Sequence, residues 1–315
     1  MSIWKYSSSF TPVISSSCQL SLGEGNTPLL FLSDMASVEG QKNLYAKLEY
    51  KNPTGSHKAR AMAYQLSLAK QQGIKKVAIS STGNAAIAAA AYAKLAQIEC
   101  TVFVSPTTSP HKLSLLKDSG CILTISERPL QELRLFCLQK NALNLNATQS
   151  DHAIEAYQTI AFELIKQLDR IDTIFVYCSS AATYLGIVKG FTEKKKQGSI
   201  HSLPQAHCCY LRETILPGVF KSQVYPGIIS KQPAILARKE QLEKAISHTK
   251  GNNFEVTDQD MLLGRDLLKK SDLDSSPEGC ALIGLQQRID PQYKNGNTVI
   301  LLTGTGEQWA TQHES

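Results

Sequence analysis

The chain has 315 residues, of which 42% are hydrophobic and 19% charged, with a formal net charge of +6. This composition is typical of a globular protein with a sizeable core, and no apolar run suits a signal peptide or a membrane span, so we expect a cytoplasmic protein without a membrane partner. The basic residues are scattered and do not alternate with aromatic residues, and the eight cysteines have no spacing that suits a metal, so neither a nucleic-acid partner nor a metal is expected.

The amino-terminal half alternates between predicted strands and helices. A polar, serine-rich arm over residues 1–20 is followed by an apolar run over residues 29–32 and a strand over residues 44–48. Helices are then predicted over residues 61–72, 85–96 and 111–119, and strands over residues 77–80, 100–104 and 121–125. Such alternation is typical of a parallel sheet with helices on both faces.

A polar segment over residues 141–151 has no clear period and is interpreted as a crossover between domains. Beyond it we predict helices over residues 153–168, 184–196, 239–247 and 259–270, and strands over residues 173–177 and 298–302, with a further short segment over residues 254–257. The run of strand, small polar turn and helix around residues 173–196 repeats the arrangement found in the amino-terminal half. The sequence therefore predicts a second sheet.

The stretch from Asn52 to Arg60 lies between a strand-like run and an alanine-rich helical run. Asn-Pro-Thr-Gly predicts a turn, in which Gly55 takes a left-handed conformation and Ser56 caps the following helix. Lys58 then falls in the first helical turn, where unpaired N–H groups and the helix dipole disfavour an ammonium. This placement indicates a lysine that forms a Schiff base with an aldehyde cofactor, although a surface lysine at a helix start is the plain alternative.

A second polar turn, Ser81-Thr82-Gly83-Asn84, separates a short buried strand from a helix of small residues. Strand, polar turn and helix form a unit that presents backbone N–H groups and hydroxyls to an anionic ligand.

The order of these motifs resembles that of the fold type II pyridoxal-phosphate (PLP) enzymes, and among them most of all the threonine synthases. The resemblance rests on the lysine stretch, the Ser81 turn and five further runs, which are Trp4 to Tyr6, Gly23 to Leu29, Thr159 to Glu163, Gly186 to Phe191 and Thr303 to Gly306. It implies an α/β fold like that of the tryptophan synthase β subunit, with two open, twisted, mostly parallel sheets flanked by helices. It also implies a smaller mobile domain over residues 47–152, a larger domain over residues 1–46 and 153–315, and a homodimer in which Trp4 and Tyr6 pack on the body or on a partner subunit.

The resemblance also implies a role for each motif, with pyridoxal 5'-phosphate as the cofactor. Lys58 is the catalytic residue and binds the cofactor covalently, and Asn84 contacts the 3′-oxygen of its ring. Ser81, Thr82 and Gly83 bind the α-carboxylate of a small amino-acid substrate. Thr303 faces the ring nitrogen, where a hydroxyl suits elimination and replacement better than transamination.

The sequence departs from the family at the phosphate-binding loop, which comprises Ser179, Ser180, Ala181, Ala182 and Thr183 and contains no glycine. A left-handed residue other than glycine costs about 1–2 kcal/mol, and we expect glycine at Ala182 to relieve such strain. The serine and threonine hydroxyls would add donors to the phosphate, so we expect a reshaped loop that still binds PLP.

A further departure is Ala59, where the family usually has an aspartate, whereas residues 277–281 resemble a family loop near the cofactor. The loss of the aspartate removes a salt-bridge partner from Arg60 and weakens local order more than chemistry. In the second segment Glu278 is a candidate site residue, although a segment this short is also an ordinary turn.

We expect a PLP-dependent lyase of the threonine synthase type that acts on a small amino acid by β- or γ-elimination or replacement. A serine or threonine dehydratase-like enzyme and a degenerate, non-catalytic homologue are the alternatives. Threonine synthase must bind the phosphate of O-phosphohomoserine, and the asparagine and arginine that suit this dianion are replaced here by Ser150 and Ala153. Unless Lys51, His152 or Arg60 replaces the lost contacts, we expect a smaller or uncharged substrate side chain.

Overall fold

The computed structural model describes residues 2–33, 35, 43–108, 110–148, 150–212, 214–216, 219–225, 229–231, 237–294 and 296–306. The chain divides into two compact units: unit 1 contains residues 1–26 and 52–156, and unit 2 contains residues 27–51 and 157–315. This division by contacts differs from the expected boundaries chiefly at the amino-terminal arm, which belongs to unit 1. Among the described residues, no helix is sufficiently long and apolar to span a bilayer.

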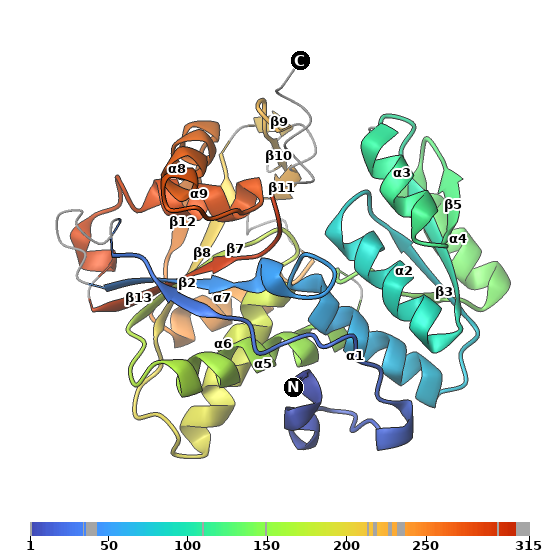
Figure 1. Cartoon of the computed structure of the whole chain (residues 1–315), viewed down its shortest axis with the longest axis horizontal. Coiled ribbons are helices and arrows are strands. Elements are labelled where there is room, and N and C mark those ends of the chain that lie inside the picture. The colour runs from blue at the N-terminus through green and yellow to red at the C-terminus, as the bar shows by residue number, and fades with distance from the viewer. Residues whose placement is uncertain are drawn as a thin grey trace. The chain divides into compact units, whose positions relative to one another are not determined.

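Unit 1 is built on a parallel sheet in the order β5-β4-β3-β6. Its strands are β3 (Lys76–Ser80), β4 (Glu99–Val104), β5 (Ile122–Ile125) and β6 (Leu143–Asn144). Its helices are α1 (Lys58–Gln71), α2 (Asn84–Ala96), α3 (Pro110–Asp118) and α4 (Pro129–Lys140). Helices α2 and α3 cover one face of the sheet, α4 covers the other, and α1 packs against α2 (Figure 1).

The sheet of unit 1 is covered closely because its helices present small or well-fitted apolar side chains. Most alanines of α2 are buried, so this helix lies near the strands without large side chains between them. On the other face, Leu133 of α4 packs with Ala78 and Phe103 in a small core. Helix α4 was not among the predicted elements, whereas the three other helices of this unit confirm the prediction.

The amino-terminal arm, residues 2–20, packs along α1. Two 3₁₀ helices, η1 (Ile3–Ser9) and η2 (Ser16–Cys18), shape it. The ring of Phe10 lies 5.6 Å from that of Trp4 and 5.0 Å from that of Tyr64 on α1. The Tyr64 hydroxyl donates to the carbonyl of Pro12 at 2.8 Å, and the N–H of Leu20 donates to Ser67 Oγ at 2.8 Å. These contacts hold the arm on the body of its own chain.

Unit 2 is built on a six-stranded sheet in the order β1-β2-β13-β7-β8-β12, parallel except for the edge strand β1. Its strands are β1 (Leu29–Phe31), β2 (Asn43–Leu48), β7 (Thr173–Tyr177), β8 (Gln205–Leu211), β12 (Asn253–Val256) and β13 (Asn297–Leu302). A separate antiparallel sheet contains β9 (Thr214–Leu216), β10 (Val219–Lys221) and β11 (Ile229–Lys231). Two open, mostly parallel sheets, one in each unit, confirm the predicted fold class.

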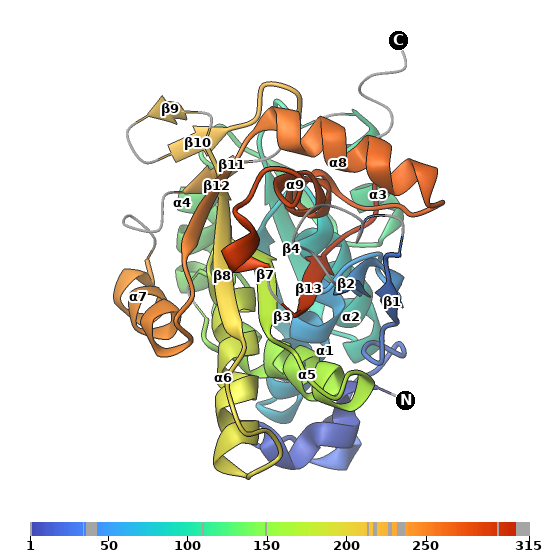
Figure 2. The same ribbon diagram turned by 90° about the vertical axis from the view of Figure 1, so that its left-hand side faces the viewer.

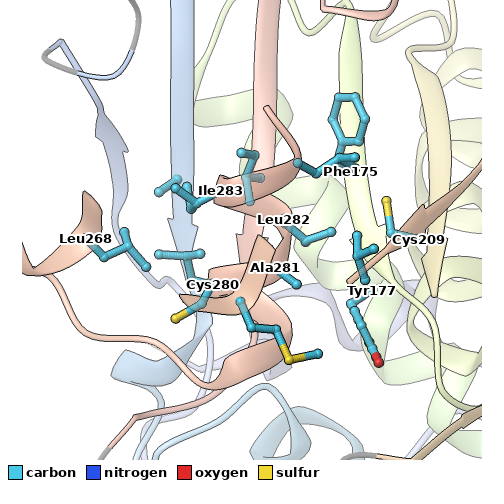
Figure 3. Close-up of a cluster of buried hydrophobic side chains, with 14 of the residues drawn as sticks. Phe175, Tyr177, Cys209, Leu268, Cys280, Ala281, Leu282 and Ile283 are labelled. Carbon is cyan, nitrogen blue, oxygen red and sulfur yellow. The ribbon is translucent and has the colours of Figure 1, made fainter. Parts of the chain in front are cut away.

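Helices cover both faces of the six-stranded sheet. They are α5 (His152–Gln167), which begins in unit 1 and continues into unit 2, α6 (Ala182–Lys196), α7 (Lys239–His248), α8 (Asp258–Lys270) and α9 (Pro277–Leu285). Helices α8 and α9 lie on one face, and α6 and α7 lie on the other (Figures 1 and 2). On the α9 side, Ala281, Leu282 and Ile283 pack with Phe175 and Tyr177 of β7 in the main core of the unit (Figure 3).

Glycines allow α8 and α9 to approach each other closely. A Cβ atom added to Gly264 would lie 1.8 Å from the carbonyl oxygen of Cys280, and one added to Gly284 would lie 2.1 Å from that of Asp260. Neither backbone carbonyl can move without shifting its helix. These two glycines therefore fix the spacing of the helix pair that covers this face of the sheet.

A buried ion pair joins β2 to α5 within unit 2. Lys47 Nζ lies 2.8 Å from Glu163 Oε2, and both side chains are essentially inaccessible to solvent. The ammonium also donates to the carbonyl of Thr27 at 2.6 Å and to Gln167 Oε1 at 2.9 Å. Because its three protons all have acceptors, the charge is well compensated despite its burial.

Candidate functional site

Lys58 is the first residue of α1 and follows a tight turn. The N–H of Gly55 donates to the carbonyl of Asn52 at 2.9 Å, and Gly55 has φ of +71°, as the turn chemistry predicts. The helix begins three residues earlier than predicted, and its N-cap is His57 rather than Ser56. Ser56 nevertheless accepts the N–H of Lys58 at 3.3 Å. The side chain of Lys58 is partly exposed, whereas His57, Ala59 and Arg60 around it are buried.

The second polar turn, Ser81 to Gly83, joins β3 to α2, which begins at Asn84. Ser81 Oγ accepts the N–H of Gly83 at 3.3 Å. The Oδ1 atom of Asn84 is buried and has no hydrogen-bond partner among the described residues. A buried amide oxygen without a partner is costly unless a ligand supplies one, so Asn84 has the character of a binding residue rather than of a turn residue alone.

The predicted phosphate loop, residues 179–183, lies between β7 and α6. Ala181 is the N-cap of α6 and has φ of +63° and ψ of −12°, a left-handed conformation, and it is 2% exposed. The strain expected at Ala182 therefore lies at Ala181, because Ala182 and Thr183 already belong to the helix. Ser179 is exposed and Ser180 is partly buried. The first N–H groups of α6 have no acceptors within the helix and suit an anion.

Thr303 directly follows β13 and is 7% exposed. The next residue, Gly304, accepts the N–H of Ser276 at 2.6 Å, which brings the start of α9 beside Thr303. Residues 277–281, expected as a loop or turn, instead form the first part of the buried helix α9. Glu278 lies in its first turn, and its Oε2 atom is buried without a hydrogen-bond partner in the part of the chain that the structure describes.

The predicted residues share one structural property. Ser81 to Asn84 follow the carboxyl end of β3 in unit 1, while residues 179–183 and Thr303 follow the carboxyl ends of β7 and β13 in unit 2. In open parallel sheets ligands bind outside the carboxyl ends of the strands. Within each unit, the sequence thus placed the candidate residues at the edge where binding is expected.

Comparison with known proteins identifies the family. Residues 20–304 match the model of a family described as pyridoxal-phosphate dependent enzymes. This chain belongs to that family. Membership confirms the resemblance found in the sequence, and it confirms PLP as the cofactor of this PLP-dependent enzyme.

Threonine synthases are among the relatives of this PLP-dependent enzyme. The chain is 30% identical to that of Halalkalibacterium halodurans, with 94% of this chain and 86% of the relative aligned. It is 29% identical to that of Methanosarcina acetivorans, over 97% and 79% of the two chains. Among solved structures, an O-ureido-L-serine synthase is similar with a TM-score of 0.75 at 16% identity, covering 92% of each chain. The cysteine synthase of Entamoeba histolytica is similar with a TM-score of 0.75 at 18% identity, covering 91% of this chain and 87% of the other. At these identities the two structures show the fold alone.

The residues present fit PLP. The unpartnered amide oxygen of Asn84 requires a polar group from a ligand, and Lys58 supplies a partly exposed amine at a helix start. The left-handed Ala181 turns the chain into α6, so that the first N–H groups of a 15-residue helix are available to a phosphate. A reshaped loop without glycine is therefore compatible with phosphate binding.

Two further residues were not singled out from the sequence. Thr54, within the lysine turn, has a buried Oγ1 atom to which no described residue is hydrogen-bonded. Glu24, within the run Gly23 to Leu29, is fully buried in unit 1. Both lie in motifs on which the resemblance rests, but the motif alone gives neither side chain a role.

Proposed function

We propose that this enzyme is a PLP-dependent lyase of the threonine synthase type, which acts on a small amino acid by β- or γ-elimination or replacement. The observation that carries the proposal is the placement of Lys58 and Asn84 as the first residues of α1 and α2, two helices that pack together in unit 1. The similarity to threonine synthases over most of the chain supports the same reaction type.

Bound PLP supplies an electron sink for the carbanion that develops at the substrate α-carbon. In our proposal Lys58 holds the cofactor through its amine and later carries the proton to and from the α-carbon. Its position in the first turn of α1 favours the neutral amine, which is the form that binds the cofactor and accepts a proton. Asn84 orients the ring through its 3′-oxygen, and Ser81, Thr82 and Gly83 bind the substrate carboxylate.

The proposed contacts of unit 2 are the phosphate loop and Thr303. Residues 179–183 and the start of α6 bind the cofactor phosphate through backbone N–H groups and hydroxyls. The Thr303 hydroxyl faces the ring nitrogen. Because a neutral hydroxyl does not hold a proton there as a carboxylate would, this assignment favours elimination and replacement over transamination.

The substrate is proposed to have a small or uncharged side chain, as serine, threonine or an O-acyl amino acid has. Ser150 Oγ accepts the N–H of His152 at 3.3 Å, and Ala153 is fully buried and has no polar side-chain atom. Neither residue supplies the bidentate contact that an arginine makes with a phosphate. This observation favours a serine or threonine dehydratase-like activity as the second candidate.

One pair of experiments tests the cofactor assignment. The purified wild type should absorb in the visible range, and borohydride should fix a pyridoxyl group on the peptide that contains Lys58. Lys58→Ala should lose both properties. A label on another lysine would refute the assignment of Lys58, and a colourless wild type that takes no label would favour a degenerate homologue.

The substrate class is tested by steady-state kinetics. Phosphate release from O-phosphohomoserine is compared with keto-acid release from serine and from threonine. We expect O-phosphohomoserine to be poorer by about a hundredfold or more, because two or three hydrogen bonds to a charged group are lost. Efficient formation of threonine would contradict this expectation and restore the reaction of the threonine synthases.

A further inference from the structure

Glu24 is a fully buried carboxylate that has no part in the cofactor contacts proposed above. Its Oε2 atom accepts the Tyr92 hydroxyl at 2.5 Å and the N–H of Leu22 at 3.0 Å. Ser21 Oγ lies 3.3 and 3.2 Å from the two carboxylate oxygens. A buried carboxylate is retained at low cost only when it is well hydrogen-bonded, and burial raises the pKa of Glu24 although these donors lower it.

Glu24 and the next residue, Gly25, contact the two segments that carry the proposed cofactor residues, which are α2 and the turn before Lys58. Tyr92 lies on α2, two helical turns beyond Asn84, and is fully buried. The N–H of Gly25 donates to Asn52 Oδ1 at 2.9 Å, and the carbonyl of Asn52 in turn closes the turn before Lys58. The short segment around Glu24 is thereby tied to the helix that begins at Asn84 and to the turn that leads into Lys58.

Arg60, which lies two residues after Lys58, is also fully buried. Burial and the Glu24 carboxylate both raise the pKa of the Tyr92 hydroxyl, while the positive charge of Arg60 acts in the opposite direction. Arg60 therefore lies within electrostatic reach of Tyr92.

We infer that Glu24 is a positioning residue that acts through the Tyr92 hydroxyl. The Glu24–Tyr92 hydrogen bond ties the segment around Glu24 to α2, which begins at Asn84, while Gly25 ties the same segment to the turn before Lys58. This inference rests on the proposed roles of Lys58 and Asn84. It adds to them a residue that touches neither cofactor nor substrate.

The test compares Glu24→Gln, Tyr92→Phe and the double variant with Ser67→Ala, a matched control. Ser67 also makes a buried hydrogen bond between α1 and the amino-terminal segment, to the N–H of Leu20 at 2.8 Å. For each full-length variant, thermal unfolding, the dissociation constant of PLP and the visible absorption as a function of pH are measured. Glu24→Gln removes the charge but keeps the shape, and Tyr92→Phe removes the hydrogen bond alone.

We expect each single variant to weaken PLP binding on the order of tenfold, the scale of a hydrogen bond to a charged group. The double variant should bind PLP about as weakly as the single variant with the lower affinity, because both changes weaken the same Glu24–Tyr92 contact. Glu24→Gln should also lower the pH midpoint of the visible band, because it removes a buried negative charge from the segment that is tied to the turn before Lys58. Ser67→Ala should keep PLP affinity within about twofold, because its lost hydrogen bond affects stability rather than the placement of Lys58 and Asn84.

The inference would be overturned if Ser67→Ala lost as much PLP affinity as Glu24→Gln or Tyr92→Phe at the same loss of thermal stability. Additive losses of PLP affinity in the double variant would overturn it as well. If Glu24→Gln fails to fold, Tyr92→Phe decides the question by the same comparison. A wild type that forms no borohydride-fixed bond at Lys58 would instead refute the proposed function. The two failures are therefore distinguishable.

Discussion

Replacing Ala181 by glycine should relieve strain that is specific to this position. Three effects contribute to the free energy of unfolding. The left-handed conformation costs alanine about 1–2 kcal/mol, glycine adds backbone entropy of about 0.4–1 kcal/mol to the unfolded chain, and the lost buried methyl group costs about 0.8 kcal/mol. These effects nearly cancel, so Ala181→Gly should be about as stable as the wild type.

Ala182→Gly is the matched control, because Ala182 is fully buried and already helical. It loses the same methyl burial and gains the same unfolded-state entropy but relieves no strain. Ala181→Gly should therefore exceed Ala182→Gly in unfolding free energy by about 1–2 kcal/mol, the cost of the left-handed conformation alone. Urea unfolding of both proteins, with and without PLP, measures this difference. Equal stability of the two variants, or greater stability of Ala182→Gly, would refute the reasoning.

Three further predictions concern unit 2. His207 is fully buried, and burial lowers its pKa to about 4 although the backbone of Tyr293 raises it. Since the unfolded state takes up the proton first, His207 stabilises the fold above pH 6.5, and this contribution is lost as the pH falls toward 4. Between pH 7 and 5 the wild type should lose about 2 kcal/mol more than His207→Gln in urea unfolding, and equal losses would contradict the assignment. Lys47→Met should lower the free energy of unfolding by about 3–5 kcal/mol, because it removes the ammonium that is paired with the buried Glu163 carboxylate. The double variant Lys47→Met and Glu163→Leu should recover much of this stability. A double variant no more stable than Lys47→Met would argue against the ion pair as the cause. Gly264→Ala should lower the thermal midpoint and cost about 1–3 kcal/mol because α8 and α9 must separate, whereas an unchanged midpoint would show that the helices shift freely.

The alternation of strands and helices was predictable because short, buried, β-branched strands are separated by polar turns. The strand at residues 173–177 illustrates this, since all five of its residues are buried in the structure. The turns before Lys58 and Asn84 were predictable from their glycines and, before Lys58, from Pro53, although α1 begins three residues earlier than predicted.

Other features depend on tertiary contacts that local sequence does not reveal. Helix α4 was missed because Leu130, Leu135 and Leu138 are exposed, so its apolar residues do not form a single stripe. Helix α9 is short and almost entirely buried, so its sequence does not alternate between apolar and polar residues with a helical period. Whether Ala181 or Ala182 takes the left-handed conformation depends on where α6 begins, a choice of one residue that composition does not settle. The amino-terminal arm is polar, and its place on α1 follows from the fit of Trp4 and Phe10 to Tyr64.

The strand order of unit 2 has a consequence for synthesis on the ribosome. Strand β2 pairs in parallel with β13, so that Leu44 lies opposite Thr298. Unit 1 has all of its residues once position 156 has emerged, and it can close while the rest of the chain is still being made. Until β13 appears, β2 has β1 on one side and an unpaired edge on the other, exposing backbone groups that invite pairing with other chains. The last of the described strands, β13, thus completes the sheet that one of the first strands began, and a chain truncated before residue 297 would retain unit 1 and an open, aggregation-prone edge.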